Sequence, residues 1–524
     1  MKKLLSILLC VVLIFTMTAC NQRNTEKLNE QGYYEGTLEI KILKAGYGVQ
    51  WLYDIAAAYE KEYTNCKVKI TETTDRDAIK AIVRSTANTS DIIVSVDSMF
   101  ANQNDGYLYD LSEVFNSVQE GYDVSLKERM NQSIWEYYET DDGKVYQMPW
   151  TTGFAGFVYN KTILDEVFGE GNYSMPRTTD ELLELCEDVL TTSKGTVAPF
   201  VMYTEGSYSN NVFQALWNQY SGERRDYYYL GYYPETNPDG SITYKKSETK
   251  EDLYKTFDDP GRLAALEVLY PIYMAVDYGG YSYNKCDYLT FQQAQRVFLG
   301  LGYGDDTTKS AFMINGDWVY KEMQDDIEKA GVDIRFMKIP IISSITETLE
   351  TENVSEETLR NVVSAVDAKE EWNASLGVSE ADYDRISVLR YTGQVTADQH
   401  VMVVPRLNKN GAQYKLAEQF LKFVAGDTAQ ALFTMDQLGL SMPYGFDTTD
   451  FVFNSFTESV KEAMGDDFHM VANNQKYPIM YAGGLKDVGY VEGQFFHKTE
   501  TPAEMQQRFT KINAENPDLL RLIK

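Results

Sequence analysis

The sequence is poor in the residues that staple small secreted domains or build metal centres. Only 5 of its 524 residues are cysteine and only 3 are histidine. Beyond position 20 the cysteines are Cys66, Cys186 and Cys286, an odd number whose spacing fits neither a zinc site nor a small disulfide scaffold. Cys186 falls on the apolar side of an expected helix, so we interpret it as a core thiol.

Long apolar runs are also missing after the first twenty positions. No later run reaches the eighteen or so residues of a membrane-spanning helix, so we expect the mature chain to be soluble apart from any anchor. Internal repeats and low-complexity stalks are absent, which disfavours an adhesin or a purely structural protein. The 524 residues are enough for two or more domains.

Positive charge is scarce relative to negative charge. Against 78 Asp and Glu stand 48 Lys and Arg, and the formal net charge of −30 becomes about −32 if Lys2 and Lys3 are removed with an export signal. This excess argues against nucleic acid and against anionic ligands drawn in by long-range attraction. A solvated acidic surface is the simplest interpretation. The 39 tyrosines and 6 tryptophans supply many flat rings, of which a few are expected to face a ligand.

The first twenty residues have the pattern of an export signal. Lys2 and Lys3 precede an apolar run of about twelve residues that ends at Phe15, too short for a hydrocarbon core of roughly 30 Å, and small residues follow. We expect residues 1–19 to be removed. The stretch Met-Thr-Ala-Cys that ends at Cys20 is similar to a bacterial lipobox, which implies a lipid on that thiol. An ordinary signal peptide with a chance cysteine is the alternative.

The expected location follows from that segment. We expect a lipid-anchored protein on the extracytoplasmic face of the cell membrane, while the type of cell envelope stays open. Residues 20–36 are polar and mixed in charge, and are predicted to form a tether.

Alternating strand and helix patterns follow the tether. The expected strands are residues 38–43, 68–72 and 91–96, and the expected helices are 51–59 and 77–85. This alternation predicts a doubly wound α/β lobe. Ligands of such lobes bind at the carboxyl ends of the strands, which places Tyr47 and Trp51 after the first strand near Asp97 and Ser98 after the third.

The chain then begins a second set of elements. Asp141, Asp142 and Gly143 predict the turn of a hairpin whose return strand is 145–150. Thr178 and Glu181 predict a capping box that opens a helix with a buried stripe over 182–190. The other predicted elements are strands at 156–159, 199–203, 311–315 and 402–405, a tyrosine-rich hairpin from 227–233 to 241–245, and helices at 260–270, 290–298, 347–391 and 412–425.

Four segments, taken together, resemble the extracellular solute-binding proteins of carbohydrate ABC importers, the group that includes maltose-binding protein. They are residues 148–161, 176–183, 311–318 and 417–423, which occur in the family's order. The resemblance implies two doubly wound α/β lobes joined by a three-crossing hinge, a periplasmic-binding-protein-like type II fold, with a ligand held between the lobes. The implied bounds are 37–149 plus 399–440 for lobe one and 150–398 plus 443–524 for lobe two, with inserted segments at 222–250 and 347–391.

A sugar offers apolar C–H faces and a rim of hydroxyls, so its site needs aromatic planes and short polar groups, especially carboxylates. Carried over from the resemblance, Trp318 is the family's stacking tryptophan and the first candidate. The other expected ligand contacts are Tyr203, Glu205 and Tyr208 in a loop of lobe two, Asp97, Ser98, Tyr47 and Trp51 on lobe one, and Trp150 at the first crossing.

Several of these side chains have a structural alternative. Trp51 begins an amphipathic helix and Trp150 lies beside a proline, so each fits packing as well as ligand contact. Asp97 is equally suited to cap a helix N-terminus.

The expected function is capture of a sugar or oligosaccharide and its delivery to the permease subunits of an ABC transporter, by a monomer without cofactor, catalytic residue or metal. A loop calcium site stays open. A receptor for peptides or another non-sugar solute is the main alternative. A surface glycoside hydrolase is a further one, although no G-x-S-x-G, H-E-x-x-H or P-loop motif occurs and His400, His469 and His497 are far apart in the sequence.

Overall fold

The computed structural model describes residues 28–204, 208–406, 411–465, 468–472, 474–481, 484–485 and 492–523. The predicted signal peptide, the lipid attachment at Cys20 and the first residues of the tether lie outside this described part. Across the described residues, no helix combines the length and the apolar character needed to cross a membrane.

The described chain forms two compact units. Unit 1 takes the chain up to Arg129, then Tyr138–Met148 and Val401–Phe433, and unit 2 takes Met130–Tyr137, Pro149–His400 and the chain from Thr434 onward. Apart from the short segment Met130–Tyr137, the chain therefore passes between the units at three places, after Met148, His400 and Phe433. The crossings predicted from the sequence lie at 149–150, 398–399 and 440–443.

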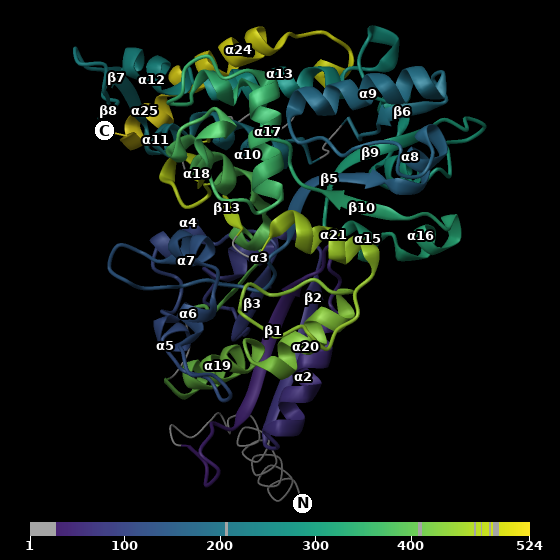
Figure 1. The fold of residues 1–524 in the computed structure, drawn as a ribbon. Helices are drawn as coiled ribbons and strands as arrows, with labels where there is room; N and C mark the ends of the chain where they lie inside the picture. Colours follow the sequence, from purple (N-terminus) through teal and green to yellow (C-terminus); the bar gives the residue numbers. More distant parts are fainter. Residues whose placement is uncertain are drawn as a thin grey trace, which may run out of the picture. The chain divides into compact units, whose positions relative to one another are not determined.

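Unit 1 is built on a sheet with the strand order β2-β1-β3-β12-β4. β1 is parallel to β2 and β3, with Ile40 opposite Ile70 and Ile92, and β12 is antiparallel to β3. Figure 1 shows β1, β2 and β3 together with α2, which packs on β2. The elements are β1 Gly36–Leu43, α2 Gln50–Glu62, β2 Cys66–Thr73, α3 Arg76–Ile82, β3 Ile92–Ser95, α4 Phe100–Asn104, α5 Ser112–Phe115, α6 Leu126–Arg129, β4 Met148–Pro149, β12 Val401–Val403, α19 Gly411–Val424 and α20 Asp427–Asp436.

The core of unit 1 follows from two periodicities. Leu38, Ile40 and Ile42 alternate along β1 and are buried, and α2 buries Ile55 and Tyr59 on one helical face. The alternation of strand and helix predicted from the sequence is therefore present, with β1 starting two residues earlier than expected.

Part of the segment predicted as tether is bound to unit 1. The backbone N–H of Tyr34 donates to Oε1 of Gln419 on α19 at 2.8 Å, and Nε2 of Gln419 donates to the carbonyl of Tyr34 at 3.1 Å. Gln419 also donates to the hydroxyl of Tyr59. A polar composition suggested a free linker, whereas these reciprocal bonds hold Tyr34 on the surface of the unit.

Unit 2 contains a sheet with the order β13-β11-β5-β9-β6, and β10 also pairs with β5. β5 is antiparallel to β9, β10 and β11, while β6 runs parallel to β9. The strands are β5 Phe154–Asn160, β6 Val197–Phe200, β9 Lys309–Gly316, β10 Ile334–Met337, β11 Thr392–Val395 and β13 His469–Val471, and a separate hairpin pairs β7 Tyr232–Thr236 with β8 Ile242–Lys246.

Helices cover this sheet. α8 and α14 pack on β9, α9 on β6, α10 on β5 and β11, and α21 on β10. The helices of unit 2 are α7 Gln132–Tyr138, α8 Lys161–Phe168, α9 Thr179–Ser193, α10 Ser209–Ser221, α11 Arg224–Leu230, α12 Lys250–Phe257, α13 Pro260–Tyr273, α14 Phe291–Phe298, α15 Val319–Glu322, α16 Gln324–Ala330, α17 Glu356–Asp367, α18 Glu380–Arg390, α21 Ser455–Met464, α22 Pro478–Tyr481, α23 Glu492–Phe496, α24 Pro502–Ala514 and α25 Pro517–Ile523.

The hairpin predicted around Asp141 is wrong. The turn itself is present, since the N–H of Gly143 donates to the carbonyl of Thr140. The chain before it, however, is helix α7, because Ile134 and Tyr138 recur at helical spacing and are both buried. The return strand is limited to β4, which pairs with β12 instead of with the chain before the turn.

The tyrosine-rich hairpin has its predicted second strand, but the first strand, predicted at 227–233, is wrong over most of its length and begins only at Tyr232. Tyr227 to Leu230 belong to helix α11, which ends at Gly231 with a positive φ of 77°. A left-handed residue at this position is a common helix C-terminus, and glycine adopts it without strain. The strands β7 and β8 follow this stop.

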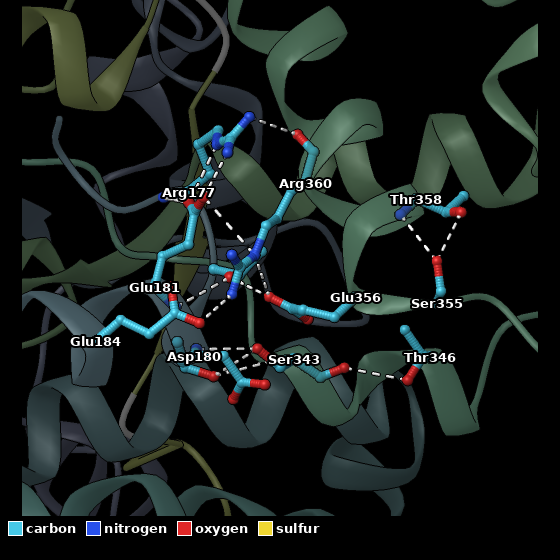
Figure 2. Close-up of polar contacts among 12 residues, drawn as sticks. Arg177, Asp180, Glu181, Glu184, Ser343, Thr346, Ser355, Glu356, Thr358 and Arg360 are labelled. Atoms are coloured by element: carbon cyan, nitrogen blue, oxygen red, sulfur yellow. Dashed lines mark hydrogen bonds and ion pairs between the residues drawn. The ribbon is translucent and has the colours of Figure 1, made fainter.

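The segment 347–391 is helical, as its period predicts, and it is packed into unit 2. Leu359, Val362 and Val363 of α17 are fully buried. Figure 2 shows the polar contacts at its base, where Arg360 of α17 pairs with Glu184 of α9 at 2.8 Å. Arg177, just before α9, donates through Nη1 to Ser364 of α17 at 2.6 Å.

The capping box predicted for α9 is half formed. The Thr178 hydroxyl accepts the N–H of Glu181 at 3.4 Å. The Glu181 carboxylate, however, accepts the backbone N–H of Arg177 at 2.7 Å instead of that of Thr178. The same carboxylate accepts a hydrogen bond from the guanidinium of Arg177 (Figure 2). Burial acts to raise the pKa of the Glu181 carboxyl, but the bonds from Arg177 outweigh burial and the pKa is lowered.

Candidate functional site

Trp318 follows the carboxyl end of β9, the place where ligand-binding side chains of α/β sheets gather. Its indole folds back over the strand, since a Cβ added to Gly316 would lie 2.1 Å from Cζ3 of the ring. Only glycine leaves room for the ring in this position. The side chain is buried, with 6% of its surface exposed, so a ligand reaches the indole only after the groups around it move apart.

Trp318 packs against a ring of unit 2, which in turn packs against a third ring. Tyr208, which immediately precedes α10, has its ring centroid 5.2 Å from that of Trp318 at an interplanar angle of 70°. Phe291, the first residue of α14, lies 5.5 Å from Tyr208 at 84°. We call these three residues the aromatic cluster. Edge-to-face pairs at such distances are a favoured arrangement of rings, so the cluster is well packed.

The chain on either side of the indole is fixed by Asp317. Its Oδ2 accepts the backbone N–H of Phe154 at 2.9 Å, and its own N–H donates to the carbonyl of Phe154 at 2.8 Å. Asp317 is 4% exposed. Because both bonds join the end of β9 to the start of β5, they hold the backbone that carries Trp318 in one place.

A carboxylate lies one helical turn after Trp318, on a residue that is exposed as a whole. Oε2 of Glu322 accepts Nε2 of Gln295 at 2.8 Å, which joins α15 to α14. Glu322 follows Trp318 by four residues, and Gln295 follows Phe291 by four, so the contact joins the turns that follow the two rings. Burial raises the pKa of the Glu322 carboxyl, and the bond from Gln295 offsets part of that rise.

The expected polar residues of unit 1 lie at the carboxyl edge of its own sheet. Asp97 follows β3, and its carboxylate pairs with Lys80 at 3.3 Å and with Arg76 at 3.6 Å, both on α3. The N-terminus of α4 has no side-chain cap, so Asp97 does not fill that alternative role. Ser98 is half-buried beside it. Asp97 is therefore an ion-paired carboxylate rather than a solvated one.

The expected rings of unit 1 are both buried. Tyr47 is 3% exposed and Trp51 is 0% exposed. The indole of Trp51 packs edge-on against Phe433 with centroids 5.4 Å apart. Packing is thus the role that the structure gives Trp51, and ligand contact by either ring stays a prediction.

Trp150 and the loop after β6 complete the expected set. The Trp150 ring lies 5.0 Å from that of His400 in an edge-on pair, and the backbone N–H of Trp150 donates to the carbonyl of His400 at 3.0 Å. Tyr203 follows the carboxyl end of β6 and is half-buried. Glu205 lies outside the described residues.

Within unit 2 the structure brings Trp318 and Tyr208 together, as neighbours of the same cluster. Sequence reasoning missed Phe291, Gly316 and Asp317. The sequence could have placed Phe291 at the start of a helix, because Thr290 and Gln293 form the capping box that begins α14. Gly316 and Asp317 stood inside the motif that identified Trp318, but their roles depend on contacts across strands.

Metal ligands are not grouped in the described ranges, where no set of three or more His, Cys, Asp or Glu side chains is placed to hold an ion. The three cysteines Cys66, Cys186 and Cys286 are buried free thiols. Burial raises the pKa of the Cys186 thiol well above its ordinary value, which suits the predicted core role.

Comparison with known proteins gives a family and a fold. The sequence model of a family described as bacterial extracellular solute-binding protein matches residues 54–452. No curated protein matches the sequence.

Several solved structures have a similar fold. A chitin oligosaccharide binding protein is 15% identical, with a TM-score of 0.59 over 92% of this chain and 99% of its own. A maltose-bound protein of T. maritima is 12% identical, with a TM-score of 0.57 over 91% and 98%. An ABC substrate-binding protein of Listeria monocytogenes in complex with cycloalternan is 14% identical, with a TM-score of 0.56 over 91% and 98%. These similarities confirm the predicted fold class of two α/β lobes.

Proposed function

We propose, from the premise that this chain belongs to the family of bacterial extracellular solute-binding proteins, that it captures a sugar or oligosaccharide and delivers it to the permease of an ABC importer. The observation that carries the choice of a sugar is the aromatic cluster at the carboxyl end of β9, in which Tyr208 joins Trp318 to Phe291. Aromatic planes bind the apolar C–H faces of sugar rings. Solved structures of similar fold support this choice, since they are described as a chitin oligosaccharide binding protein and as proteins bound to maltose and to cycloalternan.

In this proposal Trp318 is the stacking plane and Tyr208 holds its edge. Tyr203 and Glu205 follow the neighbouring parallel strand β6 and supply further contacts. On unit 1, Asp97 accepts hydrogen bonds from hydroxyls and Ser98 accepts or donates them, and Lys80 and Arg76 hold the Asp97 carboxylate in place. Tyr47, Trp51 and Trp150 are the remaining proposed contacts.

Two other functions make different demands on the chain. A receptor for peptides or another non-sugar solute is the nearest alternative, because the same fold and family accommodate it. A glycoside hydrolase requires two carboxyl groups flanking a bond at about 5–10 Å separation. The aromatic cluster supplies three rings at the carboxyl end of β9, which suits stacking on a sugar and favours binding over hydrolysis.

A thermal-shift screen separates these functions. The protein without its signal segment is heated with mono- and oligosaccharides, peptides and free amino acids, each at the same concentration. We expect at least one saccharide to raise the unfolding midpoint, since a ligand that binds only the folded state stabilises it by mass action. Stabilisation by peptides alone, or release of sugar from any glycoside, would contradict the proposal.

Membrane attachment is the second part of the proposal. A lipid on Cys20 and a tether from there to the first residues of unit 1 would hold the receptor near its permease, which raises their effective concentration. Expression of the full chain and of Cys20→Ser, followed by separation of membrane and soluble fractions, tests this. We expect the wild type in the membrane fraction and the variant outside it, each as a monomer by analytical ultracentrifugation.

A further inference from the structure

A cavity of about 230 Å3 lies in unit 2 beside β10, among side chains from β5, the segment before α9, the ends of α17 and α18, and α21. Four of its lining residues are basic, namely Arg177, Arg335, Lys338 and Arg390. We propose that this cavity binds a small oxyanion, a carboxylate or a phosphate. The inference goes beyond the proposed sugar-binding function and concerns a separate part of unit 2.

The cavity and the aromatic cluster lie at opposite ends of β5. Tyr159, which lines the cavity, is paired with Arg335 of β10. Phe154, five residues earlier in the same strand, is bound to Asp317 beside the aromatic cluster. At roughly 3.3 Å per residue the two places are about 17 Å apart along the strand. Removal of a basic group from the cavity therefore leaves the aromatic cluster in place.

The cavity wall carries more positive than negative charge. Its four basic residues face two lining carboxylates, Asp367 and Glu462. The carboxylates that neutralise Arg177 and Arg335 are Glu181 and Asp333, and neither of them lines the cavity. Since the energy of two charges falls with their separation, an anion inside interacts more strongly with the cations than with the carboxylates behind them.

Two of the basic groups retain donors for a ligand. Arg335 uses Nε and Nη2 on Asp333, and none of the described residues accepts a hydrogen bond from its Nη1. Lys338 donates to Asp367 at 2.9 Å and to the hydroxyl of Tyr391 at 3.3 Å, which leaves one of its three hydrogens. An oxyanion accepts charge-assisted bonds of this kind strongly.

Arg390 and Arg177 form the rigid frame around those donors. Arg390 has 5% of its side chain exposed and binds Asp367 through Nε at 3.0 Å and Nη2 at 2.8 Å. Arg177, 35% exposed, is held through its guanidinium by Glu181 (Figure 2) and by Ser364. The side chain of Lys338 is 14% exposed and that of Arg335 is 34% exposed, so the free donor of Lys338 is the more buried of the two.

The negative charge of the whole chain limits which anions the cavity can bind. A net charge of −30 repels anions at a distance, so an anion is bound here only through short-range contacts with the cavity wall. Bulky polyanions are disfavoured because they meet that repulsion outside the cavity. The ligand expected is therefore compact, with one or two charges.

Isothermal titration calorimetry on the protein without its signal segment tests the proposal. The probes are inorganic phosphate, acetate and succinate, each at an ionic strength held constant with NaCl. We expect saturable one-to-one binding of at least one probe, and the larger response identifies phosphate or carboxylate as the ligand class. Heats no greater than those of added NaCl for all three probes would overturn the proposal.

Paired variants then locate the binding. Arg335→Gln removes the free donor, and Arg508→Gln removes an arginine with a similar two-bond partner, Glu500, outside the cavity. Loss of a charge-assisted bond predicts roughly tenfold or greater weakening for Arg335→Gln and none for Arg508→Gln. Equal affinity of the two variants would overturn the assignment.

Lys338→Met is a second variant that tests the anion site, and it leaves the Arg335–Asp333 pair intact. It is expected to weaken the same probe severalfold while the chain still unfolds cooperatively. Unchanged affinity in a folded Lys338→Met protein would contradict the proposed site even if Arg335→Gln failed to fold.

Discussion

The indole of Trp318 and the backbone of Gly316 occupy adjacent space that a larger residue at 316 cannot share. A Cβ at this glycine would lie between 2.1 and 2.5 Å from three carbons of the ring. Those ring atoms belong to a stiff side chain that also packs against Tyr208, with ring centroids 5.2 Å apart. The position of the proposed stacking plane is thus set by the absence of a side chain two residues earlier.

Gly316→Ala is expected to displace the indole. Binding of the sugar identified by screening should weaken at least tenfold, because the ring no longer lies where its contacts hold it. The strain of overpacking is also expected to lower the free energy of unfolding by about 1–3 kcal/mol. Calorimetry with the sugar and urea unfolding measure the two effects.

A double-mutant cycle with Trp318→Ala shows whether the glycine acts through the ring. If it does, adding Gly316→Ala to Trp318→Ala weakens sugar binding no further, since there is no indole left to displace. Additive losses of binding energy would mean that the two residues contribute independently, contrary to the geometry.

Glu322→Gln is expected to stabilise the protein near neutral pH. Burial raises the pKa of Glu322 in the folded state above its value of about 4.3 in an unfolded chain. The folded state therefore favours the protonated form, and the cost of ionisation appears as pH rises through about 4.3 toward the folded pKa. A glutamine avoids this cost and still accepts the bond from Gln295.

Thermal unfolding of wild type and Glu322→Gln between pH 4 and pH 8 measures the difference. The variant should gain little at pH 4 and most at pH 8. A gain that is constant across this range would show that the carboxyl does not titrate differently in the two states.

Deletion of residues 347–391 is expected to prevent unit 2 from folding. α17 contributes Leu359, Val362 and Val363 to the core, and burial of each side chain is worth about 1.5–3 kcal/mol. The same deletion removes Arg360, whose pair with Glu184 joins α17 to α9. Soluble yield and cooperative unfolding are the measurements.

A deletion in the β7–β8 hairpin is the control for the deletion of residues 347–391. Its second strand is largely exposed, and the tip over residues 237–240 makes contacts mainly within itself. Removal of that tip should leave yield and unfolding nearly unchanged. If both deletions are tolerated equally, the segment 347–391 is not part of the core.

Local patterns were sufficient to predict much of this fold. The alternation along β1 and the helical stripe of α2 identified both elements, because burial of one face imposes a period that the sequence shows directly. The same reasoning failed before Asp141, where a turn signal was combined with the wrong preceding element. Turn residues specify a reversal of the chain, but they do not specify whether a strand or a helix enters it.

The candidate site was less predictable, since its geometry depends on contacts between distant segments. Trp318 was identified by the motif around it. Asp97 was expected as a ligand contact or a helix N-cap; it does not cap α4, and its ion pairs with Lys80 and Arg76 of the preceding helix were not foreseen. Phe291 joins Tyr208 only because α14 and α10 lie near the same end of β9, and no local pattern contains that information.

The most direct test of sugar recognition compares two tryptophans of unit 2 by calorimetry with the saccharide that gives the largest thermal shift. Trp318→Ala removes the indole of the aromatic cluster. Trp372→Ala removes a ring of the inserted segment 347–391, whose indole N–H donates to the carbonyl of Val378. We expect Trp318→Ala to lose nearly all measurable binding while it remains folded, and Trp372→Ala to bind with wild-type affinity. Wild-type affinity in a folded Trp318→Ala protein would contradict the proposed site.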